Sequence, residues 1–245
     1  METAAILNIL ESGELEVEGL LPWSSNYTFL VRICTDSKEV EAVYKPQRGE
    51  RPLWDFAQGT LCLRERAAFL ISDTIGWHLV PPTVLRHGPN GIGSVQLFVN
   101  HDPEQHYFTF EGESAYRTAL QQMVLLDVLI NNADRKAGHV LLEKNEAGEL
   151  NGRLWGIDHG ICFHNEYKLR TVIWEFAGQA IPQKLLQDLM AFQQKLDSDV
   201  KFNKQIRELI SKQEITALKR RLQSIVTNGK FRQPGPGRHY PWPPV

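Results

Sequence analysis

Apolar and polar residues alternate at period two in residues 14–21 and 27–35, near the start of the chain. This alternation is typical of β-strands that bury one face. A third apolar stretch begins at Val40 and is stopped by Pro46, which has no N–H to donate to a strand ladder. These three stretches predict an antiparallel meander. Two more stretches with strand character follow, so the predicted strands are residues 14–21, 27–35, 40–45, 83–87 and 93–99.

Helical spacing of apolar residues replaces this alternation in other parts of the chain. Residues 61–76 carry an apolar stripe that ends at Gly76, and residues 114–132 are apolar on nearly every side, which is typical of a buried helix. The pattern predicts an α+β fold, with an antiparallel sheet and one packed helix over residues 1–100 and a mainly helical part over residues 101–227. The predicted helices are residues 3–11, 61–76, 114–132, 182–195 and 203–227.

The tail, residues 228–245, is rich in proline and glycine and is predicted to be extended rather than helical or strand-like. Two arrangements stay open. The tail either packs on the body through Tyr240 and Trp242 or is disordered.

Composition narrows the class of protein. The formal net charge is −2, so no excess of basic residues is present to neutralise phosphates, and a general nucleic-acid binder is not expected. The cysteines Cys34, Cys62 and Cys162 are odd in number and far apart, which favours a reducing compartment. The start of the chain lacks a signal-peptide pattern, and no apolar run approaches the roughly 20 residues that span a bilayer. We expect a cytoplasmic protein without stable membrane insertion.

Two acids flank a predicted β-hairpin that covers residues 134–163. Asp134 follows the buried helix, and Asp158 ends the second hairpin strand in the sequence Ile-Asp-His-Gly. If the strands pair, both carboxylates and the imidazole of His139 can reach the same edge. They would repel one another unless a cation such as Mg²⁺ bound there. The structural alternative is that Asp134 caps the helix and Asp158 forms a turn.

Lys45 ends an apolar strand, where an unpaired ammonium would be costly to bury. Glu65 lies in the first turns of the helix expected to pack on that sheet. A strand lysine held by a helix glutamate is how protein kinases direct an ammonium toward nucleotide phosphates. The alternative is a solvated lysine near a strand end.

These motifs, in this order, resemble the phosphatidylinositol 3/4-kinase branch of the protein-kinase-like fold, over roughly residues 14–200. The sequences Asn-Ala-Asp-Arg at 132–135 and Ile-Asp-His-Gly at 157–160 are similar to type II phosphatidylinositol 4-kinases. With residues 52–56 and 93–97, the whole chain resembles a little-characterised bacterial family from actinobacteria and Chloroflexi. The resemblance implies two lobes, the second being mainly helical and carrying a catalytic hairpin.

The resemblance also implies roles for individual residues with ATP and Mg²⁺ as cofactors. Lys45, held by Glu65, would contact the α- and β-phosphates, and Asp158 would bind magnesium. Asp134, followed by Arg135, would orient or deprotonate the acceptor hydroxyl. The remaining nucleotide contacts would be the phosphate loop of Ser24, Ser25 and Asn26 and a hinge over residues 96–100, with Gln96, Phe98 and Val99.

One position departs from the family pattern. The second metal ligand is usually an asparagine five residues after the catalytic aspartate, and His139 stands there. Imidazole is a softer ligand than an amide oxygen. Three consequences stay open: a single metal or Mn²⁺ in place of Mg²⁺, a phosphate contact by His139, or a site that binds nucleotide without turnover.

Three functions compete on the sequence alone. The leading one is an ATP-dependent phosphotransferase whose acceptor is a hydroxyl of a protein or small molecule, with an inositol lipid ranked last. The second is a catalytically weak nucleotide-binding regulator. The third is a metal-dependent hydrolase, whose candidate ligands would be Asp134, His139, Asp158, His159 and His164.

Overall fold

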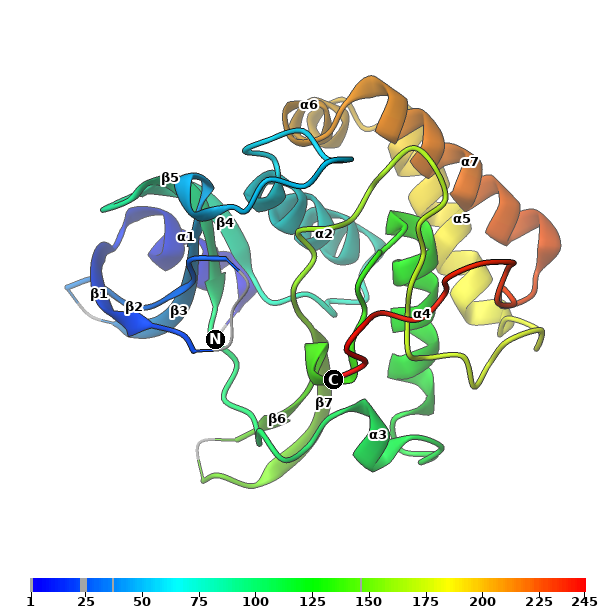
Figure 1. Ribbon diagram of the computed structural model, residues 1–245, viewed down its shortest axis with the longest axis horizontal. Coiled ribbons are helices and arrows are strands. Elements are labelled where there is room, and N and C mark those ends of the chain that lie inside the picture. The colour runs from blue at the N-terminus through cyan, green and yellow to red at the C-terminus, as the bar shows by residue number, and fades with distance from the viewer. Residues whose placement is uncertain (1, 23–25, 37, 146) are drawn as a thin grey trace.

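The alternating stretches form a five-stranded antiparallel sheet in the spatial order β1-β2-β3-β5-β4. The computed structural model describes residues 2–22, 26–36, 38–145 and 147–245. All five predicted strands are present, and the helical part of the chain lies beside the sheet as a second lobe (Figure 1). The strands are β1 (Glu14–Leu20), β2 (Phe29–Cys34), β3 (Glu39–Pro46), β4 (Thr83–Gly88) and β5 (Gly91–Leu97).

Strand β3 lies in the middle of the sheet and fixes which way Lys45 points. Val40, Ala42 and Tyr44 are buried in a small core against helix α1 (Thr3–Ser12). Because successive side chains of a strand point to opposite faces, Lys45 lies on the other face, which is turned toward the second lobe. Helix α1, predicted over residues 3–11, covers the face opposite Lys45. Helix α2 (Leu61–Ile75), the helix predicted to pack on the sheet, lies between the lobes.

Helix α2 ends at Gly76, which adopts a left-handed conformation with φ 89°, as the sequence predicts. Its residues Ala67, Phe69 and Ile71 are buried in the larger core, together with residues of the helical lobe. Since α2 contacts β4 and β5 as well as α5 and α6, a division of the chain at residue 100 stays a prediction.

The helical lobe is built around α4 (Arg117–Ile130), which is buried on nearly all sides. The prediction of a single helix over residues 203–227 is wrong, because the chain breaks at Ile210. Ser211 then caps a new helix: its Oγ accepts from Glu214 N at 3.3 Å, and its own N–H donates to the Glu214 carboxylate at 2.8 Å. The other elements are α3 (Tyr107–Phe110), hairpin strands β6 (Val140–Lys144) and β7 (Leu150–Gly156), and helices α5 (Gln183–Ser198), α6 (Val200–Leu209) and α7 (Lys212–Asn228). Within the described ranges, no helix is both long and apolar enough to cross a bilayer.

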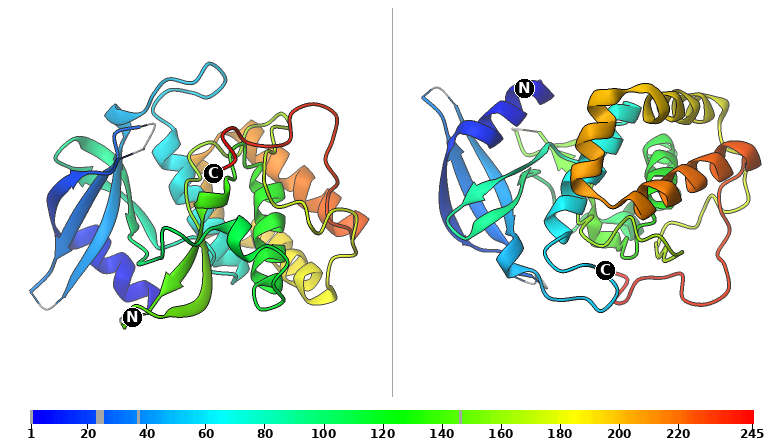
Figure 2. Two further views of the ribbon diagram at one scale, coloured as in Figure 1. Left: turned by 60° about the horizontal axis from the view of Figure 1, so that its bottom comes forward. Right: turned by 90° about the horizontal axis from the view of Figure 1, so that it is seen from above.

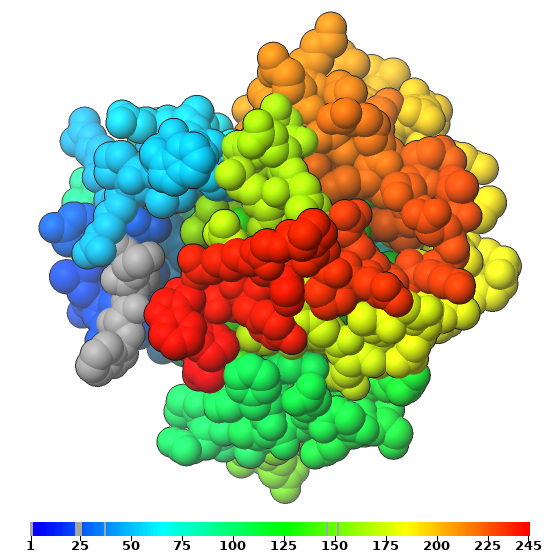
Figure 3. Space-filling view, turned by 45° about the vertical axis from the view of Figure 1, so that its right-hand side comes forward, coloured from blue at the N-terminus to red at the C-terminus, as the bar shows by residue number. Residues whose placement is uncertain are grey.

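The tail packs along the helical lobe and returns to the junction between the lobes (Figures 2 and 3). Phe231 is buried against Phe176, with ring centroids 5.5 Å apart. Tyr240 and Trp242, the anchors considered from the sequence, are 49% and 78% exposed. The tail is held instead by Phe231 and by backbone hydrogen bonds to the middle of the chain.

Candidate active site

An ion-pair cluster joins the sheet to the helical lobe. The Lys45 ammonium donates to the Glu65 carboxylate and, at 3.0 Å, to Asp158 Oδ1. Burial alone would lower the pKa of Lys45, but the carboxylates of Asp158 and Glu65 outweigh it and hold that pKa above its ordinary value. The second Glu65 oxygen accepts from the backbone N–H of His159 at 3.0 Å, so Glu65 also fixes the turn that carries Asp158.

Asp158 and His139 face each other at the end of the hairpin. Asp158 has a left-handed backbone, with φ 59°, which aspartate tolerates better than most residues. His139 Nδ1 lies 2.9 Å from the Asp134 carbonyl oxygen, and its Nε2 lies 3.4 Å from Asp158 Oδ2. A carbonyl oxygen can only accept, so Nδ1 carries the hydrogen, and the neutral ring turns its Nε2 lone pair toward a carboxylate.

This arrangement fits a bound cation. Burial lowers the pKa of His139 to about 4, although the Asp158 carboxylate opposes this, so the ring is neutral at pH 7. Two electron-rich atoms then face each other, which a cation between them would stabilise. A histidine that ligates a metal usually donates its other ring N–H to a carbonyl or carboxylate, as His139 does here.

The number of protein ligands is small. In the described ranges, no group of three or more His, Cys, Asp or Glu residues is arranged to hold a metal ion. Mg²⁺ and Mn²⁺ sites in phosphoryl-transfer proteins often use one or two protein ligands and complete the shell with phosphate and water. The Asp158–His139 pair suits that kind of site, and its imidazole favours Mn²⁺ more than an amide would.

Asp134 lies on the same side of the cleft, in a loop held by Asn132. The Asn132 side chain accepts from Asp134 N at 3.0 Å and donates to the Asp127 carboxylate at 2.9 Å. Burial raises the pKa of Asp134 to about 6, helped by the Asp158 charge and opposed by Lys136, whose ammonium is 3.9 Å from Oδ2. The carboxyl group is thus a better proton acceptor than an ordinary aspartate, and it is still mostly ionised at pH 7.

Arg135, predicted to act beside Asp134, does not reach the cleft. Its side chain is fully buried, and its guanidinium donates to both oxygens of Asp127 at 3.0–3.2 Å. It also donates to the carbonyls of His139 and Ile157, at 3.1 and 2.9 Å, and contacts the His159 ring at 2.7 Å. Arg135 therefore positions the loop and the hairpin end and cannot touch a substrate. Its partner Asp127 was missed from sequence, although an acid in an otherwise apolar helix was the available signal.

A cavity of about 680 Å³ opens between the lobes beside these groups. The hinge residues predicted from sequence, Gln96, Phe98 and Val99, all line it. The Gln96 amide is already bonded to Thr83 Oγ1 at 2.8 Å, and Phe98 N donates to the Glu41 carbonyl at 3.0 Å. One of the two N–H groups of the Gln96 amide and the Phe98 backbone N–H are therefore already used within the protein.

Of the predicted phosphate loop, Asn26 lies among the described residues. Ser24 and Ser25 lie outside the described residues. Asn26 lines the cavity, and its Oδ1 accepts from Arg51 N at 2.9 Å.

The five candidate ligands of a metal-dependent hydrolase do not come together. His159 is fully buried against Arg135, and burial lowers its pKa. His164 packs against Phe56 and accepts from Glu166 N through its Nδ1 at 3.0 Å. Only Asp134, His139 and Asp158 border the cavity.

The sheet, the helical lobe and the lysine–glutamate pair beside the cleft define a protein-kinase-like fold. The structure of the Golgi casein kinase with Mn/ADP bound is similar, with a TM-score of 0.60, 18% identity, and coverage of 92% of this chain and 74% of that one. The Helicobacter pylori proinflammatory kinase CtkA is similar too, with a TM-score of 0.57, 12% identity, and coverage of 91% of this chain and 94% of that one. These likenesses establish the two-lobed fold.

The family follows from sequence comparison. Residues 86–226, more than half of the chain, match the phosphatidylinositol 3- and 4-kinase family, and the chain belongs to this family. Protein Rv2133c of Mycobacterium tuberculosis is 37% identical, with 96% of this chain and 94% of that protein covered. Phosphatidylinositol 4-kinase gamma 4 of Oryza sativa subsp. japonica is 33% identical, over 50% of this chain and 24% of its own length. The family predicted from the motifs is thus confirmed.

Proposed function

We propose that this kinase-like protein is an ATP-dependent phosphotransferase that moves the γ-phosphoryl group of ATP to a hydroxyl of a protein or small molecule. One observation carries the proposal: Lys45, Asp134, His139 and Asp158 border a single cavity of about 680 Å³ between two lobes. Phosphoryl transfer depends mainly on positioning and charge neutralisation, and these four groups supply both.

Lys45 is suited to hold the α- and β-phosphates. Its ammonium has three N–H donors, of which Glu65 and Asp158 take two. The raised pKa keeps it charged at neutral pH. Glu65 is almost completely buried, so it can hold the ammonium in place without competing for the nucleotide.

Asp158 and His139 would hold a divalent ion, Mg²⁺ or Mn²⁺, which would neutralise charge on the phosphates. The Asp158 side chain is 44% exposed toward the cleft, although the Lys45 ammonium holds its pKa below the ordinary range. It therefore stays ionised and accessible as a ligand.

Asp134 would orient the acceptor hydroxyl and take its proton. The acceptor oxygen bonds to the γ-phosphorus, the bond from that phosphorus to the β–γ bridging oxygen breaks, and ADP leaves with the electron pair. With a pKa of about 6, Asp134 is ionised and ready to accept the proton at pH 7.

The adenine would lie against the hinge. Among the described residues, the Phe98 N–H, the Val99 carbonyl and the Asn100 carbonyl are already bonded. The Phe98 carbonyl and the Val99 N–H are therefore the groups proposed to meet the adenine edge. The apolar side chains of Val43 and Leu141 line the same cavity and would enclose the ring.

A nucleotide-binding regulator is the second candidate, because His139 replaces the usual asparagine ligand. The acceptor is also a proposal: the names of the plant relatives suggest an inositol lipid as the alternative to a protein or small molecule.

The test combines binding with turnover. Thermal unfolding is followed with and without ATP and Mn²⁺ or Mg²⁺, and ADP release is measured in the same buffers. ATP at about 100 times its dissociation constant should stabilise the fold by about 2.7 kcal/mol, or roughly 5–10 °C. The variant Asp158→Asn should lose most of this shift, and Asp134→Asn should keep it but lose turnover. The surface variant Asp197→Asn, whose partner is Lys219, is the control.

Each outcome separates the candidates. Stabilisation without ADP release or phosphate transfer would favour the regulator. If no nucleotide stabilises the protein with either metal, the phosphotransferase proposal fails.

A further inference from the structure

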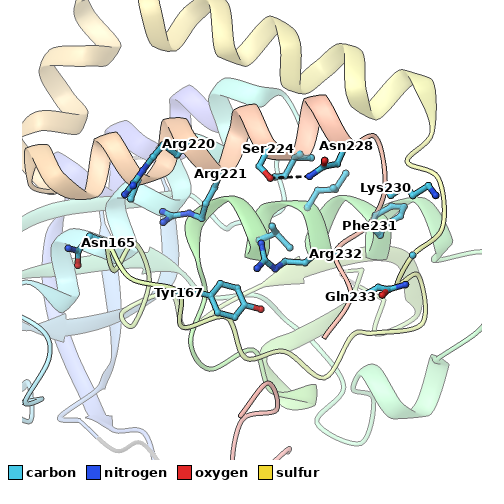
Figure 4. Close-up of a pocket in the computed structure, with 15 residues that line it drawn as sticks. Asn165, Tyr167, Arg220, Arg221, Ser224, Asn228, Lys230, Phe231, Arg232 and Gln233 are labelled. Carbon is cyan, nitrogen blue, oxygen red and sulfur yellow. Dashed lines mark hydrogen bonds between the residues drawn. The ribbon is translucent and has the colours of Figure 1, made fainter. Parts of the chain in front are cut away.

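A second cavity, of about 870 Å³, lies in the helical lobe and has no part in the chemistry proposed above. Helix α7 forms one wall, and the tail at residues 230–233 forms another (Figure 4). Tyr167 and Asn165, from the segment before α5, also line it. Figure 4 shows Arg220 and Arg221 descending from α7 on the side of Asn165, with Arg232 and Tyr167 below them.

The charged residues that line this cavity are all basic. Four cations border the cavity, and no acidic residue does so among the described residues that line it. None of the four forms an ion pair with a described carboxylate, whereas nearby Lys219 and Lys168 are paired with Asp197 and Asp55. In a chain with a net charge of −2, such an unpaired cluster is not a reflection of overall composition. The four cations are Arg220, Arg221, Lys230 and Arg232.

Arg221 is held rigidly and left incompletely bonded. Its Nε donates to the Leu129 carbonyl at 2.8 Å and its Nη1 to the His164 carbonyl at 3.3 Å. Its Nη2 is shielded from water and has no hydrogen-bond partner in the described part of the chain. Burial, together with the neighbouring Arg220, lowers the pKa of Arg221 to about 10. An incoming anion would relieve this repulsion and offer acceptors.

The floor of the cavity is apolar. Leu125 and Val128 of α4 and Phe231 of the tail line it and are almost completely buried. The Tyr167 ring lies under the Arg232 guanidinium, 4.3 Å from its carbon, and adds an aromatic face. A ligand that uses the whole cavity therefore combines a multiply charged anion with an apolar or aromatic body.

We propose that this cavity binds an organic phosphate, a phosphate monoester joined to an apolar body. Arginine forks match phosphate geometry, and a phosphate carries more charge than a carboxylate to set against four cations. The proposal does not depend on phosphoryl transfer in the interlobe cleft.

The experiment is calorimetric titration of the full chain with phenyl phosphate, compared with phenol and with inorganic phosphate. Phenyl phosphate should bind and phenol should not. Inorganic phosphate should bind more weakly than phenyl phosphate, because it has no apolar group to contact the floor of the cavity. The double variant Arg220→Gln/Arg232→Gln, which changes two exposed side chains, should weaken binding about tenfold or more for each arginine lost. Arg207→Gln removes an exposed arginine of α6 outside the cavity and should bind normally. Binding should also weaken as salt is added.

A variant in the interlobe cleft shows in which of the two cavities phenyl phosphate binds. Lys45→Gln should leave the phenyl phosphate affinity unchanged. Loss of binding in Lys45→Gln, or unchanged binding in the double arginine variant, would overturn the proposal. The proposal would also be overturned if inorganic phosphate bound as tightly as phenyl phosphate, or if phenyl phosphate did not bind.

A second experiment distinguishes a lipid headgroup from a soluble organic phosphate. Flotation with phosphatidylcholine vesicles that contain phosphatidic acid, but not with phosphatidylcholine alone, would identify the ligand as a lipid headgroup, provided that the double arginine variant no longer floats. Binding of phenyl phosphate without flotation would identify a soluble organic phosphate.

Discussion

Replacing Asp134 with asparagine should make the protein more stable while abolishing the proposed phosphoryl transfer. The carboxylate is destabilising because its pKa in the folded protein, about 6, lies above the ordinary value of 3.8. The stability that a group with a raised pKa contributes is complete below its unfolded pKa and is lost as the pH rises through its folded pKa. At neutral pH the fold therefore bears the cost of an ionised, mostly buried carboxylate that Asp134→Asn removes.

The size of the effect follows from that difference in pKa. At about 1.36 kcal/mol for each pKa unit, the difference between 3.8 and about 6 corresponds to about 3 kcal/mol at most. The side chain is 25% exposed, so solvent screening reduces the figure, and we expect roughly 1–3 kcal/mol above pH 7. The advantage of the variant should fall to about half its full value near pH 5 and become small near pH 4.

Urea denaturation of both proteins between pH 4 and pH 8 measures this difference directly. Asp197→Asn, an exposed acid, should show no comparable gain at any pH. The reasoning is refuted if Asp134→Asn is no more stable than the wild type at pH 8, or if its advantage is the same at pH 4 and pH 8.

Three further variants test separate parts of the site. His139→Asn introduces the asparagine that the resemblance implies as the second metal ligand and should raise the ratio of Mg²⁺- to Mn²⁺-supported turnover on the order of tenfold; an unchanged ratio would show that His139 is not a metal ligand. Arg135→Lys breaks the forked, buried contact with Asp127 and should lower the free energy of unfolding by roughly 3–5 kcal/mol; full stability with lost activity would instead support a direct catalytic role. Deletion of residues 234–245 should leave ATP binding intact, measured by calorimetry, and lower the free energy of unfolding by about 1–3 kcal/mol for each backbone N–H left without a partner. Unchanged stability after the deletion would mean that the packing of the tail contributes nothing.

Much of the cleft could be predicted from the sequence alone. The face of a sheet on which a side chain lies follows from its position in the strand, and the order of the elements follows from the order of the sequence. Lys45 follows from alternation along a strand that ends at Pro46, and Glu65 from its place in the next helix. The break between α6 and α7 had a local signal too, because Ser211 and Glu214 are spaced as a capping box.

The remaining details depend on contacts between distant segments. Nothing local to Arg135 says that its guanidinium turns inward to Asp127, eight residues earlier, rather than outward to the cleft. The orientation of the His139 ring depends on the Asp134 carbonyl, and the left-handed backbone of Asp158 on the pairing of two strands. The cationic cavity was not predictable for the same reason, since its walls come from α7, the tail and the segment at Tyr167.

The hydrogen bonds of the tail determine the order in which the parts of the cleft can form. Pro244 accepts from Ala137 N at 2.8 Å, inside the loop that carries Asp134, and the His239 carbonyl accepts from Thr171 N at 3.1 Å. These partners are separated by long stretches of chain, so loops must close before either bond can form. During synthesis, the residues proposed to hold the nucleotide emerge well before residues 239–244. A growing chain can therefore first form the side of the cleft that carries Lys45 and Glu65. The loop that carries Asp134 is held in place only after the tail has been made and has formed these two hydrogen bonds.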